Sequence, residues 1–369
     1  MKRTLFQLLK KLVLTLYRIP FVKRNVRGLL AGLQAPVRTA DAYIQFGHFK
    51  RDDDRVIPLL QGLRDDIKPG WRSMLDAESS YAFPVPAQVR AKAEACEDAV
   101  GNTARLLASY GVSLQGKRVL EVGCYDGLHS LKLSKHVGAT VTASDMSSYY
   151  VVQRPGDTPD DASLMQQNTW LGSLRDHSLA AVGGCYPGVD YVEDDISRST
   201  LESDSFDAIC SWEVLEHIND PPAALGHMFR LLTPGGVCFH EYNPFFCLEG
   251  GHSLCTLDFH WGHARLTNAE FDRYVETLRP IEAAIDKNFF HQSLNRMSLA
   301  MLEGMAVDAG FEVLAILPFA SAQHALLLDA DVLSDAREVH PSVDELDLIS
   351  PSVWVILRKP GKDHANEGA

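Results

Sequence analysis

Two carboxylates and an imidazole lie close together in the segment EVLEH, as Glu213, Glu216 and His217. The segment follows an apolar run that reads as a strand, and we expect it to begin a helix. Spacings of three and four residues then put the three side chains on one helical face. Such a set can bind Mg²⁺ or Mn²⁺. Two other readings stay open: a histidine acts as a base without a metal, or the acidic residues complement the helix dipole.

A second group of polar and aromatic side chains lies in residues 243–296, an insert that follows the next strand. Within fourteen residues it holds His252, His260, Trp261, His263 and Arg265. Neutral imidazoles beside an aromatic face and a guanidinium suit a saccharide or a polyphenol with adjacent hydroxyls. We therefore expect this group to contact a substrate, with Tyr242 as a wall of the pocket. The alternative for any single member is a structural role in the core.

The stretch from Arg118 to Asp145 indicates a nucleoside-bearing cofactor. It reads as an apolar strand, a tight turn with acidic residues and glycines, a helical run, and a second strand that ends in Asp145. An acid at that point can bind ribose hydroxyls. The turn itself holds Glu121 and Asp126, and two carboxylates repel a pyrophosphate. They suit a cationic cofactor that carries an amino acid.

These side chains need a scaffold that brings strand ends together. Short apolar runs such as VLEVG, FDAIC and GVCFHEY alternate with helical segments, as buried parallel strands do. Ligands of such sheets bind beyond the carboxyl ends of the strands. The segments at these ends should surround one crevice: 121–127, Asp145, Asp195, 211–217 and 241–246.

The turn resembles motif I of the class I S-adenosylmethionine (SAM)-dependent methyltransferases, whose pattern is E-x-G-x-G-x-G. Glu121, Gly123 and Gly127 match it, and Tyr125 departs from it. Later segments resemble the family's motifs in the same order: 191–195, 206–211, 232–236, 309–319 and 353–360. The resemblance implies an α/β, Rossmann-like fold. Its sheet would have seven mostly parallel strands, a terminal antiparallel pair and helices on both faces, and its cofactor would be SAM.

The resemblance also implies a role for each cofactor-binding candidate. Glu121, Gly123, Tyr125 and Gly127 form the loop on the methionine side, and Asp145 binds the ribose diol. Asp195 and Ile196 match the positions that contact adenine in the family. Ser211, at the end of the fourth strand, is a further candidate.

The E-x-x-E-H segment resembles that of ubiquinone-type O-methyltransferases and small-RNA 2′-O-methyltransferases, in which it binds a divalent ion with a later histidine. In the RNA enzymes that histidine lies shortly before a T-x-x-E-F helix start, as His263 does here before 267–271. The resemblance implies a metal site of Glu213, Glu216, His217 and His263. The metal would lower the pKa of a substrate hydroxyl. Without a metal, His217 or His263 would be the base, with Glu213 as a further catalytic candidate.

Composition limits the partners. The chain has 369 residues and a net charge of −13, which argues against an extended nucleic-acid surface. Its seven cysteines include no C-x-x-C pair and suggest buried thiols in a reducing, cytoplasmic compartment. No apolar run is long enough to cross a membrane.

The chain divides into four parts. Residues 1–30 predict a basic amphipathic helix, which either lies on an anionic membrane, such as the inner face of the plasma membrane, or packs on the protein's own core. Residues 31–94 predict a loosely helical extension that covers the active site. Residues 95–360 predict the methyltransferase domain, with inserts at 146–188 and 243–296. Residues 361–369 predict a disordered tail.

The preferred interpretation is O-methylation of a hydroxyl on a glycan, a lipid-linked sugar or a small aromatic molecule. One alternative is modification of RNA, because the E-x-x-E-H pattern recurs in RNA enzymes. Another is a non-catalytic protein that binds SAM or S-adenosylhomocysteine (SAH), which the departure at Tyr125 would permit. The sequence identifies neither the acceptor nor the oligomeric state.

Overall fold

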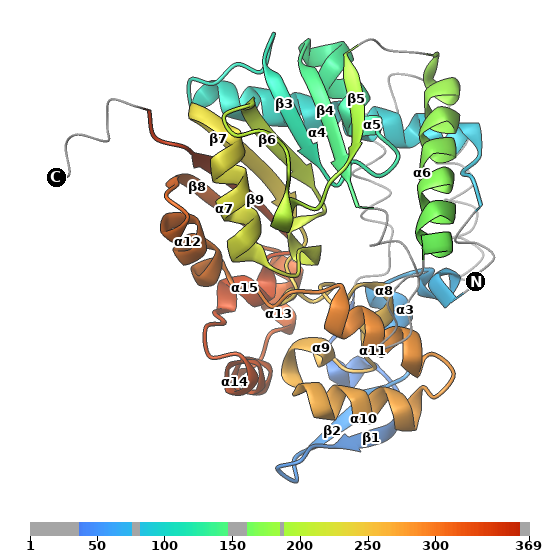
Figure 1. Ribbon diagram of the computed structural model, residues 1–369. Coiled ribbons are helices and arrows are strands. Elements are labelled where there is room, and N and C mark those ends of the chain that lie inside the picture. Colours follow the sequence, from blue (N-terminus) through green and yellow to red (C-terminus); the bar gives the residue numbers. More distant parts are fainter. Residues whose placement is uncertain (1–36, 76–81, 147–160, 185–187, 362–369) are drawn as a thin grey trace, which may run out of the picture.

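The computed structural model describes residues 37–75, 82–146, 161–184 and 188–361 (Figure 1). The predicted helix at 1–30 and all but the first residue of the predicted tail lie outside these ranges. None of the helices within them is both long and apolar enough to cross a bilayer.

A seven-stranded sheet forms the centre of the molecule, in the order β5-β4-β3-β6-β7-β9-β8. Its strands are β3 (Arg118–Val122), β4 (Thr140–Asp145), β5 (Val189–Glu193), β6 (Phe206–Trp212), β7 (Leu232–Tyr242), β8 (Glu312–Phe319) and β9 (Ser352–Arg358). The first five run parallel, and β9 pairs antiparallel with both β7 and β8. The predicted sheet and its terminal antiparallel pair are confirmed.

Helices cover both faces because successive residues of the buried strands point to opposite sides. Val119, for example, packs with α4 (Pro86–Ser109) in one apolar cluster. Leu120, the next residue, belongs to a second cluster with α7 (Pro221–Leu231) and α12 (Leu299–Asp308). On the first face, α5 (Leu128–Lys132), the π-helical turn η4 (Leu133–Val137) and α6 (Asp161–Val182) lie beside α4.

A second body, which we call the cap, lies beyond the carboxyl ends of the strands and is formed by residues 37–75, 243–296 and 320–350 (Figure 1). It has its own apolar core, to which all three segments contribute. Its elements are the 3₁₀ turn η1 (Ala40–Ala42), the hairpin β1 (Gln45–Lys50) and β2 (Val56–Leu60), α3 (Leu63–Ile67), the 3₁₀ turn η2 (Trp71–Leu75), α8 (His252–Cys255), α9 (Gly262–Arg265), α10 (Asn268–Leu278), α11 (Ala283–Gln292), α13 (Ala322–Leu327), α14 (Ala330–Val339) and α15 (Glu345–Ile349). The N-terminal extension contains short helices, as expected. The hairpin and the third cap segment were not predicted.

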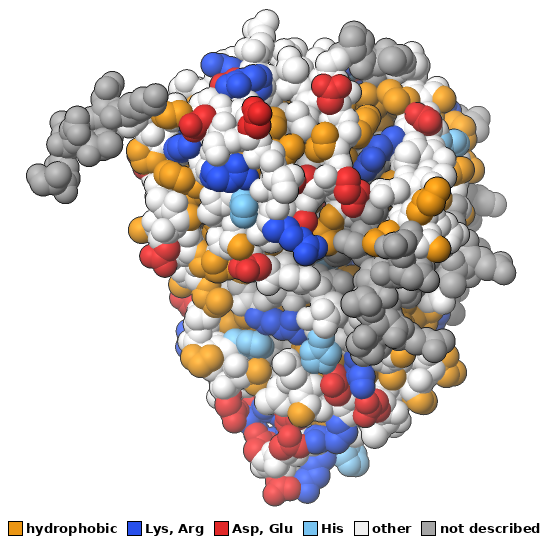
Figure 2. Space-filling model, viewed as in Figure 1, with side chains coloured by type: hydrophobic (Ala, Val, Ile, Leu, Met, Phe, Trp, Pro, Cys, Tyr) orange, Lys and Arg blue, Asp and Glu red, His pale blue; other side chains and the backbone are white. Residues whose placement is uncertain are grey.

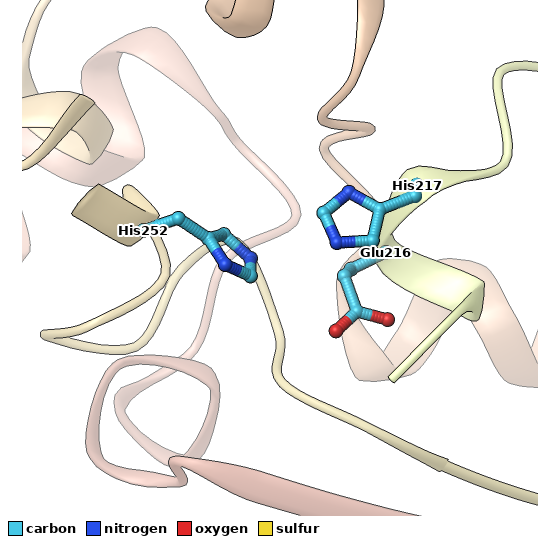
Figure 3. Close-up of side chains that lie close together, drawn as sticks. All are labelled: Glu216, His217 and His252. Carbon is cyan, nitrogen blue, oxygen red and sulfur yellow. The ribbon is translucent and has the colours of Figure 1, made fainter. Parts of the chain in front are cut away.

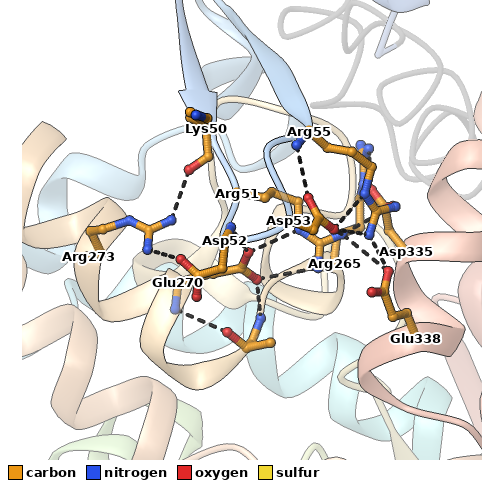
Figure 4. Close-up of polar contacts among 11 residues, drawn as sticks. Lys50, Arg51, Asp52, Asp53, Arg55, Arg265, Glu270, Arg273, Asp335 and Glu338 are labelled. Atoms are coloured by element: carbon orange, nitrogen blue, oxygen red, sulfur yellow. Dashed lines mark hydrogen bonds and ion pairs between the residues drawn. The ribbon is translucent and has the colours of Figure 1, made fainter.

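Buried ion pairs join the segments of the cap (Figure 4). Asp335 of α14 accepts from Arg265 of α9 at 2.9 and 2.8 Å, and it also pairs with Arg55. Arg51, which follows β1, lies 3.2 Å from Asp335 and 3.2 Å from Glu270 of α10. Residues far apart in the chain are thereby held in one network, and charged side chains of both signs gather on the surface of this end of the cap (Figure 2).

The segment after β6 differs from the prediction of a helix that begins at Glu213. Glu213 has a left-handed backbone, with φ at 59°, and 215–217 form only a 3₁₀ turn, η7 (Leu215–His217). The helix α7 begins later, where Asp220 accepts a hydrogen bond from the amide of Ala223 at 3.1 Å and proline occupies the first turn. The acidic residues therefore lie in a turn rather than on a helical face.

Candidate active site

The glycine loop after β3 has the backbone that its sequence requires. Gly123 and Gly127 both have φ at 72°, and a Cβ on Gly127 would lie only 2.3 Å from the hydroxyl of Tyr191. Tyr125 also has a positive φ, 43°. The departure from the family pattern at Tyr125 therefore keeps the left-handed backbone that glycine would adopt at this position.

Asp145, at the end of β4, is tied to this loop. Its Oδ2 accepts from the amide of Tyr125 at 2.5 Å, and its Oδ1 accepts from the amide of Met146 at 2.8 Å. Arg175 of α6 adds a brace, because its Nε donates to the carbonyl of Tyr125 at 2.9 Å and its Nη2 lies 3.9 Å from Asp145. Sequence reasoning missed Arg175. It lies in the 146–188 insert, to which no function was assigned.

Glu121 lies beneath the loop rather than on its surface. It is buried, and its carboxylate accepts from Ser130. Burial raises its pKa to about 8. His129 lies 3.8 Å from the same carboxylate and stacks on Trp212 with ring centroids 4.5 Å apart. Glu121 therefore stabilises the loop from below.

The other cofactor candidates lie at neighbouring strand ends. Asp195 follows β5, accepts from the amide of Ser197 at 2.9 Å and pairs with Arg198 at 2.9 Å. Ile196 is buried in the core between the sheet and α7. The hydroxyl of Ser211 is buried and lies 2.8 Å from Nδ1 of His240. Among these three residues, the Asp195 side chain is the one with solvent access.

An acid and two imidazoles meet at the boundary between the sheet and the cap (Figure 3). The ligand atoms of Glu216, His217 and His252 all lie within 4.8 Å of one another. Within the described part of the chain, Oε2 of Glu216 and Nε2 of His252 are buried without a hydrogen-bond partner. Nδ1 of His217 lies 2.6 Å from the carbonyl of Ser293, so Nδ1 carries the proton and Nε2 the lone pair. We call these three residues the acid–imidazole cluster.

The cluster shares Glu216 and His217 with the predicted metal set, contains His252 instead of His263, and does not include Glu213. Nε2 of His263 lies 2.7 Å from the carbonyl of Phe245, and burial lowers the pKa of His263 to about 4. His263 therefore supports the fold of the insert. His252, which was predicted to contact substrate, lies in the cluster at the position where His263 was expected. The ring of Phe289, which was not predicted, lies 6.1 and 5.9 Å from the rings of His217 and His252.

The electrostatics of the cluster suit a bound cation. Burial raises the pKa of Glu213, and the charges of Glu216 and Glu241 raise it further. Burial also raises the pKa of Glu216 and lowers that of His217. A cation among these groups would stabilise the ionised carboxylates and bind the neutral imidazoles. The unpartnered atoms of Glu216 and His252 therefore fit a divalent metal.

Three of the other predicted substrate residues, His260, Trp261 and Arg265, are engaged away from the cluster. Trp261 is buried in the cap and donates to the carbonyl of Leu348 at 3.0 Å. His260 lies 2.9 Å from the carbonyl of Arg38, and Arg265 belongs to the ion-pair network of the cap. Tyr242 is buried in the core of the sheet. Its hydroxyl has no hydrogen-bond partner among the described residues, and burial raises its pKa, with the charge of Glu216 as a further cause.

The glycine loop is in contact with the turn that leads into the cluster. A Cβ on Gly123 would lie 2.5 Å from Cγ2 of Val214, the residue between Glu213 and Leu215. The loop that resembles a cofactor loop thus packs directly on the turn that carries Glu213 and Glu216. A ligand on the loop and a ligand at the cluster would be neighbours.

Residues 91–316 match the family model of the methyltransferase domain. Ubiquinone biosynthesis O-methyltransferase from Coxiella burnetii is 33% identical over 128 residues, which cover 35% of this chain and 44% of that protein. The protein of the same name from Psychrobacter cryohalolentis is 29% identical over 192 residues, which cover 50% of this chain and 63% of that protein. The chain therefore spans less than two thirds of the length of these relatives.

Solved structures give a more distant likeness. The S-adenosylmethionine dependent methyltransferase from Mesorhizobium loti is 14% identical, with a TM-score of 0.38, and the match covers 67% of this chain and 93% of that one. A SAM-dependent methyltransferase from Methanosarcina mazei is 14% identical, with a TM-score of 0.39, and the match covers 69% and 98%.

Proposed function

Since this chain belongs to the class I SAM-dependent methyltransferases, we propose that it transfers a methyl group. The acceptor we propose is a hydroxyl oxygen next to the acid–imidazole cluster. The acceptor classes we propose are a small aromatic molecule, a glycan and a lipid-linked sugar. The names of the curated relatives favour the aromatic class. The observation that carries the proposal is the contact between Gly123 of the cofactor loop and Val214 beside the cluster.

The reaction we propose is an in-line displacement. The acceptor oxygen attacks the methyl carbon, the C–O bond forms as the C–S bond breaks, and the electron pair of that bond returns to sulfur to give SAH. The proton of the hydroxyl goes to a base, and Glu213 suits this role because burial raises its pKa toward neutrality. The chain's main contribution is to hold the hydroxyl and the methyl donor in line.

We further propose that Glu216, His217 and His252 hold a divalent cation such as Mg²⁺ or Mn²⁺. A bound cation would lower the pKa of the acceptor hydroxyl. The hydrogen bond from His217 to the carbonyl of Ser293 supports the proposal, since metal-binding imidazoles usually donate their other N–H to such a group. In a metal-free alternative, His217 takes the proton itself. Full activity in excess EDTA would support that alternative and end the metal proposal.

The function is tested by label transfer. Purified protein is incubated with SAM labelled in its methyl group and with cell extract, and the label is followed into small molecules, lipids, polysaccharide and RNA. We expect an alkali-stable methyl ether in a small molecule, a glycan or a lipid-linked sugar. Label in RNA, or in no fraction while SAH still binds, would contradict the proposal.

We propose that residues 1–30, which lie outside the described residues, attach this cytoplasmic enzyme to an anionic membrane surface through their basic and apolar residues. Fractionation of cells that carry the chain without these residues tests the idea. Membrane partition that does not change on deletion would refute it.

A further inference from the structure

Lys68 lies in the turn between α3 and η2, which is fastened to the helix that begins at His252. Arg64 of α3 donates to the carbonyls of Ser253 and Leu254 at 2.9 and 3.2 Å. The guanidinium of Arg64 also lies 3.5 Å above the ring of Trp71. Arg64, one helical turn before Lys68, thereby ties this segment to the residues that directly follow His252 of the acid–imidazole cluster.

The ammonium group of Lys68 differs from the buried cations of the cap in having no fixed partner among the described residues. Arg64 pairs with Glu282 at 2.8 Å, Arg265 with Asp335 and Arg279 with Asp258, each also at 2.8 Å. Lys68 is half-buried, and its side chain makes neither a hydrogen bond nor an ion pair with any residue in the described ranges. Its three N–H donors can therefore serve a ligand.

The charge of Lys68 acts on buried groups from several elements around the cluster. Burial raises the pKa of Glu213 and Glu216, and the charge of Lys68 opposes this rise. Burial lowers the pKa of His252 and His263, and the charge of Lys68 lowers both further. Such effects weaken with distance. The ammonium is therefore within electrostatic reach of the cluster.

We propose that Lys68 binds an anionic group of the methyl acceptor, a carboxylate or a phosphate. One oxygen of each nearby carboxylate has a partner: Glu249 pairs with His324 at 2.9 Å, and Glu216 accepts from the amide of Asn243 at 3.1 Å while its other oxygen belongs to the cluster. An acceptor with a negative group near its hydroxyl would bridge Lys68 and the cluster. The inference rests on the proposed function and deepens it, because it assigns the charge of the acceptor.

The test compares Lys68→Met with Lys68→Arg and with Lys50→Met, an exposed lysine whose partner is Asp54. Each variant is first titrated with SAH, whose affinity should equal that of the unmodified protein. The label-transfer assay with cell extract is then repeated, and the labelled product is passed over an anion exchanger. We expect a retained product, a yield at least about tenfold lower with Lys68→Met, and near-normal yields with the other two variants.

Kinetics with the isolated acceptor provide a second readout. Lys68→Met should raise KM while kcat changes by less than about threefold, and the KM of the unmodified protein should rise with salt. A neutral labelled product, or an unchanged yield with Lys68→Met, would overturn the inference and leave the proposed function standing. The absence of any labelled product despite SAH binding would instead overturn the proposed function, and this inference with it.

Discussion

The sheet and the cap hold their functional side chains by different means. Asp145 is the last residue of β4, and Asp195 lies shortly after the end of β5. The strands of the parallel sheet therefore position both side chains. His252 and Lys68 depend instead on contacts between distant segments, such as the hydrogen bond from Arg64 to Ser253 across 189 residues of sequence. A site shared by the two bodies should therefore have separable parts, one for the cofactor and one for the acceptor.

The largest expected effect concerns the cap side. Glu216→Gln keeps the shape of the side chain and removes its charge. Turnover should fall about a thousandfold, because a lost cation site costs several kcal/mol of transition-state stabilisation. The affinity for SAH should stay within about twofold. Steady-state kinetics and calorimetric titration measure both, with Glu303→Gln on the exposed face of α12 as the control. Turnover within about threefold of the unmodified protein would show that the cluster is not catalytic.

The second prediction concerns the stability of the cap. Asp335→Ala removes a buried carboxylate shared by three arginines, so the free energy of unfolding should fall by about 3 kcal/mol. Glu338 also pairs with Arg55, but its side chain is 53% exposed, and Glu338→Ala should cost less than about 1 kcal/mol. Urea unfolding of the two variants tests the contrast. Equal losses of unfolding free energy in the two variants would mean that burial of a carboxylate does not determine how much it stabilises the cap.

The sheet side is tested by Asp145→Ala, which removes the predicted ribose contact. The affinity for SAM and SAH should fall about tenfold to a hundredfold, or about 1.5 to 3 kcal/mol. Asp190→Ala, at an exposed position of β5, is the control. Arg175→Gln should lower the affinity less, and its effect should largely disappear in the Asp145→Ala background, because the two residues brace one loop. Unchanged SAH binding in Asp145→Ala would refute the assignment.

These regions also differ in how far the sequence determines them. The strands and the loop glycines follow from apolar runs and turn residues that are local in the chain, and the arrangement of the strands in the sheet was expected from the family resemblance. The exchange of His263 for His252 was not predictable, because it depends on tight packing: a Cβ on Gly251 would lie 2.9 Å from Nδ1 of His263. The helix predicted at Glu213 was wrong because prolines and the Asp220 cap place its start later. Residues 320–350 were missed because their apolar residues join a core that is built largely from distant segments of the chain.

The smallest expected effect is on how the free energy of unfolding depends on pH, through a carboxyl group of the cap. Asp286 is buried, its carboxylate oxygens have no hydrogen-bond partner among the described residues, and burial raises its pKa from 3.8 to about 7. Between these values the folded chain keeps a proton that the unfolded chain releases, so this group's contribution to stability is lost as pH rises. Asp286→Asn should therefore become more stable relative to the unmodified protein, by about 2 kcal/mol between about pH 5.5 and about pH 8. The measurement is the free energy of unfolding of both proteins as a function of pH, and parallel curves would contradict the prediction. Asp308→Asn, at an exposed position of α12, is the control.

The position of a metal tests most directly whether the sheet and the cap build one catalytic site. Crystals of the full chain with SAH are soaked in manganese chloride, and anomalous scattering locates the ion. The account predicts one strong peak bound by Glu216, His217 and His252, with SAH seated on the glycine loop beside it. A well-occupied SAH with no peak at these residues, even at saturating manganese, would contradict the account.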